Sequence, residues 1–221
     1  MILHCVNSFV RAVRRGPYQL KRRAQSVAHT RQRCIEAARR VIAQRGLHRI
    51  TLSEVAGAAG VSRPTVYQQF GSKLRLIDAV TRDLDRCGGY VQLLGALTIE
   101  DPVEALLASI RAGYGVYACD PQLFRQLYGV AAGDPQVAEL MGMREEGRRN
   151  FVSRLVARLD ASSHLRPGVT REDATAILLA LTHFATFDQF QAIPDARPAA
   201  DIAIAILTQT LLRELPRNSR L

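Results

Sequence analysis

The sequence is poor in the residues and runs that mark metal, redox and membrane proteins. Its four cysteines lie 29, 53 and 32 residues apart, so no pair has the spacing of a metal-ligand or redox motif. We therefore expect a reduced, cytosolic protein with packed or idle thiols. No apolar run approaches the roughly 18 residues that a membrane span needs. The basic residues near the start follow the first apolar stretch, which is the wrong order for a secretory signal.

The sequence also lacks the local patterns of catalytic sites. It contains no paired-carboxylate helix, Gly-rich phosphate loop, metal-ligand spacing or nucleophile motif. We therefore expect no enzyme activity, no catalytic residue, no metal and no cofactor.

Lysine is scarce, because Lys21 and Lys73 are the only two among the thirty Lys and Arg residues. The net charge of +10 therefore depends on arginine, and an arginine-rich genome would be one explanation for it. The distribution of the charge argues against that explanation. Residues 1–86 hold 17 basic and 5 acidic residues, a net charge of +12, whereas residues 87–221 hold 13 and 15, a net charge of −2. A composition bias would affect both parts, so we expect the first 86 residues to attract an anionic partner such as nucleic acid.

The segment 1–28 has no acidic residue at all. It carries six cations and has Gly16-Pro17 in its middle, a composition typical of a solvated chain. We expect a basic, mostly disordered arm here. Three roles remain open for this arm: a solvated extension, a contact to DNA, or an amphipathic membrane binder.

Residues 29–75 have the signals of a small helical domain. A first helix with an apolar face is expected to end at Gly46. Thr51 and Glu54 form a capping box that starts a second helix, and Gly60 can adopt the positive φ of a tight turn. Ser62 then caps another short helix. Two short helices joined by a glycine-containing turn, after a longer first helix, predict a helix-turn-helix in a three-helix unit.

The second of these short helices, residues 62–70, has the composition of a recognition helix. Its inward side is Val66 and Phe70, at positions i and i+4. Arginine and glutamine can make paired hydrogen bonds to base edges, and hydroxyl groups suit phosphates. The residues expected on the outward side of the helix are of these types. They are Arg63, Thr65, Tyr67, Gln68 and Gln69.

The run 51–74 resembles the DNA-binding domain of the TetR family of bacterial transcriptional regulators. The resemblance covers residues 31–77 and rests on the Gly-Val-Ser turn at 60–62, the Tyr-x-x-Phe pair at 67–70 and Ser-Lys-x-x-Leu at 72–76. It implies DNA contacts for one set of residues, with Lys73 on a phosphate. This set is Thr51, Ser62, Arg63, Pro64, Thr65, Tyr67, Gln68 and Lys73.

Several positions of this domain leave alternatives open. Pro64 and the pair Gln68-Gln69 depart from the family's usual residues, which affects the base sequence that is recognised rather than the binding mode. From the residues alone, Tyr67 could be a core aromatic instead of a phosphate ligand. Lys73 could be a solvated side chain.

Residues 76–221 are expected to be helical throughout. Asp-Pro pairs at 101–102, 120–121 and 134–135 predict helix starts, and about six further helices follow from such boundaries. The resemblance implies an effector-binding and dimerisation domain whose last two long helices form a four-helix bundle with a second subunit. These two helices are expected at residues 171–193 and 199–212. A helix over 199–212 would be apolar around most of its circumference and must therefore be covered on more than one side. A second subunit could cover both helices, or both could be ordinary core helices of a monomer.

The sequence gives only weak signals for the residues of an effector pocket, because each candidate residue would also suit an ordinary hydrophobic core. His183 in particular would serve as a hydrogen-bonded core histidine or as a ligand contact. The candidates are mostly aromatic, as suits an apolar cavity with a few polar groups. They are Tyr114, Tyr117, Phe124, Tyr128, Met141, Met143, Phe151, His183 and Phe187.

The sequence thus predicts an all-α protein with an N-terminal helix-turn-helix domain and a C-terminal helical ligand-binding and dimerisation domain. We expect a cytoplasmic, nucleoid-associated homodimer that binds double-stranded operator DNA and no membrane. The preferred function is a repressor that a small apolar or amphipathic effector releases from its operator. The alternative is a DNA-binding interaction or architectural protein of the same fold without an effector.

Overall fold

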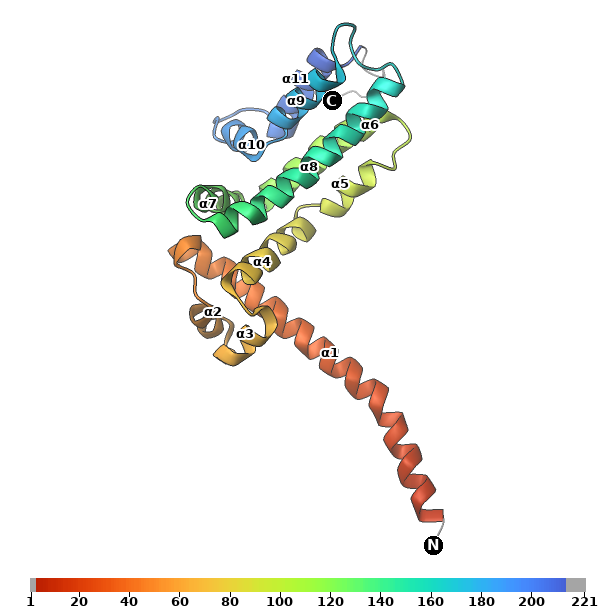
Figure 1. The fold of residues 1–221 in the computed structure, drawn as a ribbon, viewed down its shortest axis with the longest axis vertical. Coiled ribbons are helices and arrows are strands. Elements are labelled where there is room, and N and C mark those ends of the chain that lie inside the picture. The colour runs from red at the N-terminus through yellow and green to blue at the C-terminus, as the bar shows by residue number, and fades with distance from the viewer. Residues whose placement is uncertain (1–2, 214–221) are drawn as a thin grey trace. The chain divides into compact units, whose positions relative to one another are not determined.

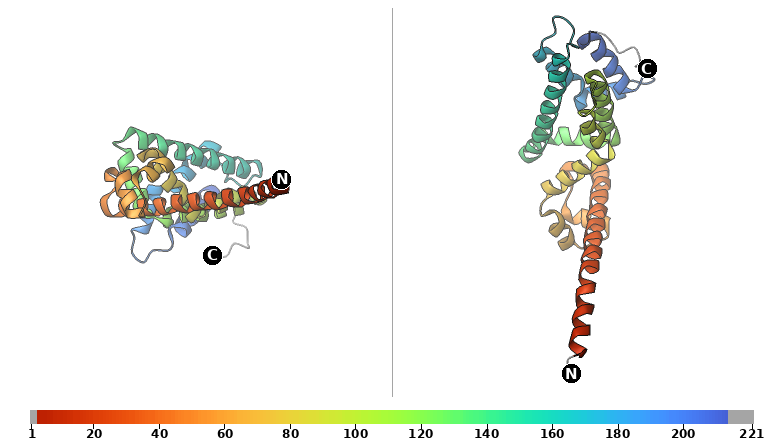
Figure 2. Two further views of the ribbon diagram at one scale, coloured as in Figure 1. Left: turned by 90° about the horizontal axis from the view of Figure 1, so that it is seen from below. Right: turned by 90° about the vertical axis from the view of Figure 1, so that its right-hand side faces the viewer.

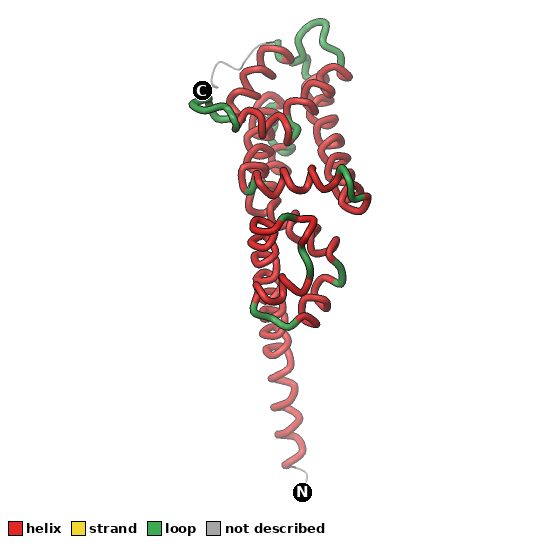
Figure 3. Tube along the Cα trace, turned by 90° about the vertical axis from the view of Figure 1, so that its left-hand side faces the viewer, coloured by secondary structure: helices red, strands yellow, loops and turns green. Residues whose placement is uncertain are grey.

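The computed structural model describes residues 3–213, with side chains from residue 22 onward. Within this range the chain forms eleven α-helices and one short 3₁₀ helix, and no strand longer than an isolated bridge between Leu165 and Leu212 (Figure 3). The all-α class is therefore confirmed. None of the helices described here has the length and apolar character to cross a membrane.

The chain divides into two compact units between Val80 and Thr81, five residues after the boundary expected from the sequence. The first unit contains α1 (Leu3–Arg45), η1 (Leu47–Arg49), α2 (Leu52–Ala59), α3 (Arg63–Phe70) and the start of α4 (Lys73–Cys87) (Figure 1). Its core is built from the apolar faces predicted for these helices. The buried residues include Ile35, Ala38, Val41, Ile42, Val55, Ala56, Ala59, Val66, Phe70, Ile77 and Val80.

Helix α1 corrects one expectation. The arm at residues 1–28 was expected to be mostly disordered, but α1 is continuous from Leu3 to Arg45 and passes through Gly16-Pro17 (Figure 2). The physical reason is that a packed helix already exists at residues 31–45. Adding residues to an existing helix avoids the cost of nucleation, which an isolated segment would have to meet.

The second unit contains seven helices after the end of α4. They are α5 (Tyr90–Ala96), α6 (Pro102–Cys119), α7 (Pro121–Ala131), α8 (Pro135–Ala161), α9 (Arg171–Leu181), α10 (Phe184–Gln191) and α11 (Ala199–Leu211). The predicted Asp-Pro starts are confirmed, because Asp101, Asp120 and Asp134 each accept a hydrogen bond from an amide in the first turn. Helices α9, α10 and α11 lie together in this unit (Figure 1).

The segment 171–193 is two helices rather than the one expected. The break falls at Thr182 and His183, where the side chain of His183 caps α10 by accepting a hydrogen bond from the amide of Ala185 at 3.1 Å. A break frees backbone carbonyls, and each freed carbonyl needs a new donor. Here Tyr114 donates to the carbonyl of Leu181, and Tyr117 donates to that of Thr182 at 3.4 Å.

Two cysteines differ from the expectation of reduced, packed or idle thiols, and the side chain of Cys5 lies outside the described residues. Cys87 and Cys119 form a disulfide with 6.3 Å between their Cα atoms, while Cys34 is free and buried. The spacing of 32 positions from Cys87 to Cys119 matches no motif, because the bond joins the last residues of two different helices, α4 and α6. Only the fold brings these positions together.

Candidate nucleic-acid interface and effector site

Caps at both ends fix the position of α2. The hydroxyl of Thr51 accepts from the amide of Glu54 at 3.2 Å, and the carboxylate of Glu54 accepts from the amide of Thr51 at 3.1 Å, so the predicted capping box is confirmed. Arg45 also donates to Glu54, at 2.5 Å. The hydrogen bond from Thr51 lowers the pKa of Glu54, and Arg45 adds to this. Gly60 ends the helix with φ +63°, the left-handed conformation expected of the turn.

The start of α3, which corresponds to the candidate recognition helix, is capped as predicted. Ser62 accepts from the amide of Thr65 at 3.3 Å, and the two hydroxyl oxygens lie 2.8 Å apart. Gly71 ends α3 with φ +72°, and Ser72 caps α4 by accepting from the amide of Arg75. The helix-turn-helix is therefore held by local hydrogen bonds that the sequence specifies.

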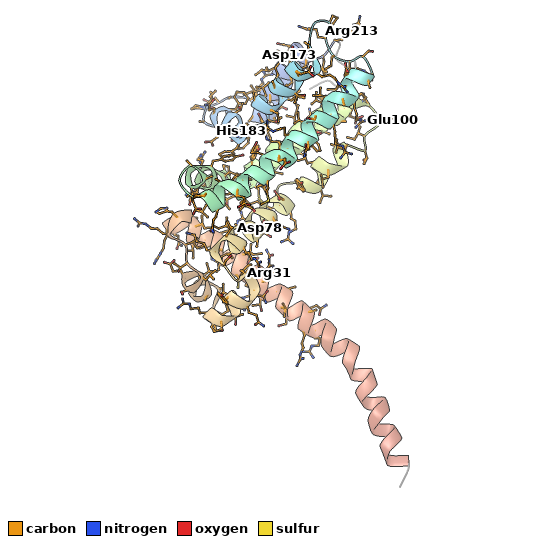
Figure 4. All side chains as sticks on the ribbon, in the orientation of Figure 1. Arg31, Asp78, Glu100, Asp173, His183 and Arg213 are labelled. Atoms are coloured by element: carbon orange, nitrogen blue, oxygen red, sulfur yellow. A yellow bond between two sulfur atoms is a disulfide. The ribbon has the colours of Figure 1, made fainter. Side chains whose placement is uncertain are left out.

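Arginines of α1 hold the other ends of α2 and α3. Arg31 lies on α1 (Figure 4). It donates to the carbonyl of Gln69 at 2.8 Å, and its guanidinium lies 4.5 Å from the centre of the Phe70 ring. Arg33 donates to the carbonyl of Ala59 at 2.6 Å. Cations at helix C-termini satisfy free carbonyls and the negative end of the helix dipole. Part of the positive charge of this unit therefore serves the fold, which the charge count alone did not reveal.

The residues expected at DNA lie mostly on the surface. Tyr67 is 64% exposed while Val66 and Phe70 are 0% and 3% exposed, so the alternative that Tyr67 is a core aromatic is wrong. Two members of the expected set, Thr65 and Lys73, are half-buried. The exposed members are Thr51, Ser62, Arg63, Pro64, Tyr67 and Gln68.

Lys73 already has a partner within the unit. Its Nζ donates to the carbonyl of His48 at 2.8 Å, so it is not simply solvated. An ammonium group has three donors, which leaves two for another acceptor. Lys73 therefore links the start of α4 to η1 and keeps the capacity to meet a phosphate.

In the second unit, most of the expected pocket residues form one aromatic cluster. The ring of Tyr117 lies 5.1 Å from that of Phe124 and 5.6 Å from that of Phe187, and Tyr114 lies 5.3 Å from Phe187. These separations are typical of favourable aromatic pairs. The cluster consists of Tyr114, Tyr117, Phe124, Tyr128, His183, Phe184 and Phe187.

The remaining candidates are not part of these ring contacts. Met141 is buried on α8, and Phe151 is half-buried on the same helix. Among the described residues, the ring of Phe151 makes none of the aromatic contacts of the cluster. Met143 is 59% exposed, which does not suit a pocket lining.

An ion pair on α8 borders the cluster, and it was not among the residues expected there. Tyr128 donates to Glu145 Oε1 at 2.6 Å, and Arg148 donates to Glu145 Oε2 at 2.6 Å. Arg148 also donates to the carbonyl of Leu179 at 2.8 Å. In the sequence, Glu145 and Arg148 are an ordinary i, i+3 pair of the kind found on solvated helix faces, so no local pattern singled them out.

Burial and hydrogen bonding in and beside the aromatic cluster shift the pKa values of several groups. Burial raises the pKa of Glu145, but the hydrogen bonds from Tyr128 and Arg148 outweigh it and leave the pKa below its usual value. Burial raises the pKa of Tyr117 to about 12. Burial lowers the pKa of His183, whose Nε2 lies 3.9 Å from Glu145 Oε1. The site thus combines apolar rings with a carboxylate that stays ionised, an arginine and a neutral imidazole.

The capped α2 and α3, with a polar exposed face on α3, define a helix-turn-helix protein. Residues 35–80 match the family model of the bacterial regulatory proteins of the tetR family. Residues 35–80 therefore form a DNA-binding domain of the tetR type.

Individual relatives agree with this assignment. The chain is 35% identical over 126 residues to the HTH-type transcriptional regulator AlkX of Mycobacterium tuberculosis, a match covering 57% of this chain and 58% of that protein. The match thus spans less than two thirds of that curated relative.

Solved structures show the same fold over most of their length. NalD, the secondary repressor of the MexAB-OprM multidrug efflux pump in Pseudomonas aeruginosa, superposes with a TM-score of 0.67 and 21% identity over 86% of this chain and all of that chain. A SmeT–triclosan complex superposes with a TM-score of 0.67 and 16% identity over 87% of this chain and 98% of the other.

Proposed function

We propose that the protein is a DNA-binding transcriptional regulator whose α3 enters the major groove of a double-stranded operator. The observation that carries this proposal is the division of α3 into a buried side, Val66 and Phe70, and an exposed side that displays Arg63, Tyr67 and Gln68. The match of residues 35–80 to the tetR family model supports it. A regulator of this kind works in the cytoplasm, at the nucleoid.

We propose further that it acts as a homodimer on a pseudo-palindromic site. On α11, Ala203 and Leu207 are buried within the chain, whereas Ile202 and Ile206 on another side of the helix are only half-buried. Residues of this type gain stability when a second copy covers them. Two copies would place two α3 helices in half-sites about one turn of DNA apart, roughly 34–36 Å.

The preferred activity is that of a repressor with a small apolar or amphipathic effector bound at the aromatic cluster. NalD is a repressor and SmeT is found with triclosan, which supports this choice by analogy of fold. For release, an effector must favour the non-binding state, and a loss of about 100-fold in operator affinity corresponds to about 2.7 kcal/mol of coupling. The alternative remains a DNA-binding interaction or architectural protein that uses the same fold without an effector.

Selection of DNA from a random library by the full-length protein tests the DNA-binding function. We expect an enriched sequence with two-fold symmetry, and binding to it should be lost in the double variant Arg63→Ala, Tyr67→Ala. The matched control is Arg149→Ala, Tyr90→Ala, which removes an exposed arginine and an exposed tyrosine from the second unit. Binding that survives the first variant would exclude α3 as the recognition surface.

A thermal-shift measurement separates the two candidate activities. A panel of small molecules that includes triclosan should contain a compound that raises the melting temperature by mass action and weakens DNA binding. The raised melting temperature should disappear in Tyr128→Ala, which removes one ring of the cluster. No stabilising compound in a broad panel would favour the architectural alternative.

A further inference from the structure

The disulfide between Cys87 and Cys119 lies where small solutes can reach it. Cys87 is exposed and Cys119 is half-exposed, whereas the free thiol of Cys34 is buried. Exchange of a disulfide requires a thiolate to reach one of its sulfur atoms, so accessible bonds are the labile ones. The bond is therefore open to reduction and re-formation without unfolding of the chain.

The surrounding contacts keep the two cysteines close even when the bond is open. Asp85, two residues before Cys87, accepts two hydrogen bonds from Arg144 of α8, at 2.6 and 3.0 Å. Gly88, the residue after Cys87, packs so tightly on α6 that an added Cβ would overlap Val116 and lie 2.9 Å from the carbonyl oxygen of Gly115. Two thiols held next to each other in this way form a disulfide more readily than two thiols on a mobile chain.

The bond joins two helices with different tasks. Helix α4 begins in the first unit, where Lys73 is bonded to His48, and ends in the second unit at Cys87. Helix α6 ends at Cys119 and carries Tyr114 and Tyr117, whose hydroxyls hold the carbonyls at the break between α9 and α10. The disulfide thus ties the helix that connects the two units to the helix that carries part of the aromatic cluster.

We propose that Cys87 and Cys119 form a reversible thiol–disulfide pair through which oxidants and small thiols control DNA binding. This inference rests on the proposed function. Cytoplasmic proteins rarely keep structural disulfides, and those that form there are mostly catalytic or redox-sensing. A repressor must bind DNA in the resting, reduced cytoplasm, so the oxidised form is the one with weaker DNA binding.

The chemistry of the pair balances with peroxide as oxidant and a low-molecular-weight thiol as reductant. One thiolate attacks hydrogen peroxide and becomes a sulfenic acid, releasing water with the required proton. The second thiol then attacks the sulfenic sulfur and forms the S–S bond. The sulfenic hydroxyl leaves with the thiol proton as a second water, so two electrons have passed from the two sulfur atoms to the peroxide. In reduction, one small thiol forms a mixed disulfide and a second releases the protein dithiol, giving one oxidised small-thiol disulfide.

The state of the cysteines is measured first, on the full-length protein. Treatment with dithiothreitol should expose two additional thiols per chain, and alkylation followed by peptide mass spectrometry should place them on Cys87 and Cys119. Hydrogen peroxide should remove them again without joining two chains. A bond that dithiothreitol opens only in denaturant, or one that links two chains, would overturn the proposal.

DNA affinity is then compared between the two states, using DNA selected from a random library by the reduced protein. We expect the oxidised form to bind about tenfold more weakly, equivalent to about 1.4 kcal/mol. The double variant Cys87→Ser, Cys119→Ser should bind like the reduced protein with or without peroxide, and Cys34→Ser should keep the full response.

The outcomes separate the redox inference from the proposed function. If the reduced protein selects a symmetric DNA site and both states bind it equally or the oxidised state binds it better, the redox inference is wrong and the DNA-binding function stands. If neither state nor the double serine variant selects any DNA, the proposed function is wrong and the redox inference falls with it.

Discussion

Arg31 lies on α1 with its guanidinium beside the Phe70 ring and its Nη1 bonded to the carbonyl of Gln69. Both contacts depend on the flat, forked guanidinium, which a lysine ammonium does not reproduce. The residue therefore supports the end of α3 that follows the exposed face proposed to meet DNA. It is a positioning residue in the proposed DNA complex.

We predict that Arg31→Lys weakens DNA binding several-fold while leaving its salt dependence unchanged. The charge is kept, so the number of neutralised phosphates stays the same, and only the support of α3 is removed. Titration of the selected DNA at several salt concentrations measures both quantities. Arg40→Lys is the matched control, because its bond to the carbonyl of Ala58 is long, at 3.4 Å, and should matter less. A changed salt slope in Arg31→Lys would indicate a direct phosphate contact instead.

Gly88 offers a second test at the scale of one residue. We predict that Gly88→Ala lowers the free energy of unfolding by about 1–3 kcal/mol, because the added Cβ meets the backbone of α6 and forces it to move. Urea unfolding measures the change. Gly95→Ala, in α5, has no atom within 4 Å of the added Cβ and should be neutral or stabilising by up to about 1 kcal/mol. Equal effects of the two variants would contradict the close approach of α4 and α6.

At the scale of elements, the break between α9 and α10 depends on donors from other helices. We predict that Tyr114→Phe destabilises the protein by about 1–3 kcal/mol, because the carbonyl of Leu181 loses its partner in a buried place. Tyr117→Phe should cost less, since its bond to the carbonyl of Thr182 is long, at 3.4 Å. Thermal and urea unfolding of both variants give the comparison. The reverse order would mean that the hydroxyl of Tyr117, not that of Tyr114, holds the break.

The cap of α10 should make stability depend on pH. Burial lowers the pKa of His183, with Arg148 adding to the shift and Glu145 opposing it. The unfolded chain therefore binds a proton at higher pH than the folded one. The stabilising contribution is complete above about pH 6.5 and declines as the pH falls toward the lower folded pKa.

We predict a melting temperature that falls between pH 7.5 and pH 5.5 and falls less in His183→Asn. Asparagine is a good N-cap but does not titrate, so the cap is kept and the proton site is removed. Melting curves across this range measure both slopes. Equal slopes would assign the pH dependence to another group.

The sequence was sufficient for elements that local signals specify. The capping box at Thr51 and Glu54, the turn at Gly60 and the Asp-Pro starts of three helices all form as predicted, because each is decided by residues within a few positions of one another. The break at Thr182 and His183 was not predictable in this way. It depends on Tyr114, Tyr117 and Arg148, which are far away in the sequence.

The candidate site also has a part that local sequence signals predict and a part that depends on tertiary packing. The exposed face of α3 follows from helical periodicity, since Val66 and Phe70 define the inward side. The role of Glu145 and Arg148 depends on which rings the fold brings to α8. The disulfide of Cys87 and Cys119 likewise depends on tertiary packing alone.

At the scale of the whole molecule, the charge is concentrated in the first 86 residues, at +12 against −2 for the remainder. Some of that charge is used inside the fold by Arg31 and Arg33. The segment before residue 22 contributes four further cations. Its share in DNA binding can be measured separately from that of α3.

We predict that removal of residues 1–21 weakens binding to non-specific and selected DNA by a similar factor and lowers the salt slope. Each phosphate that is no longer neutralised should reduce the slope of log K against log salt by about 0.9. Binding titrations with selected and scrambled DNA measure both effects. A weaker affinity for the selected DNA alone would instead assign base recognition to this segment, and an unchanged affinity would make it a solvated extension.

The bond between Cys87 and Cys119 also encloses α5 in a covalent ring. Closing a loop of 32 residues removes conformations from the unfolded chain, and loop entropy predicts a gain of roughly 3–4 kcal/mol for the closed form. A single protease cut within residues 88–118 would leave two fragments that stay joined until a reductant separates them. The pattern of fragments on a gel would therefore record the oxidation state in which the protein was taken from the cell.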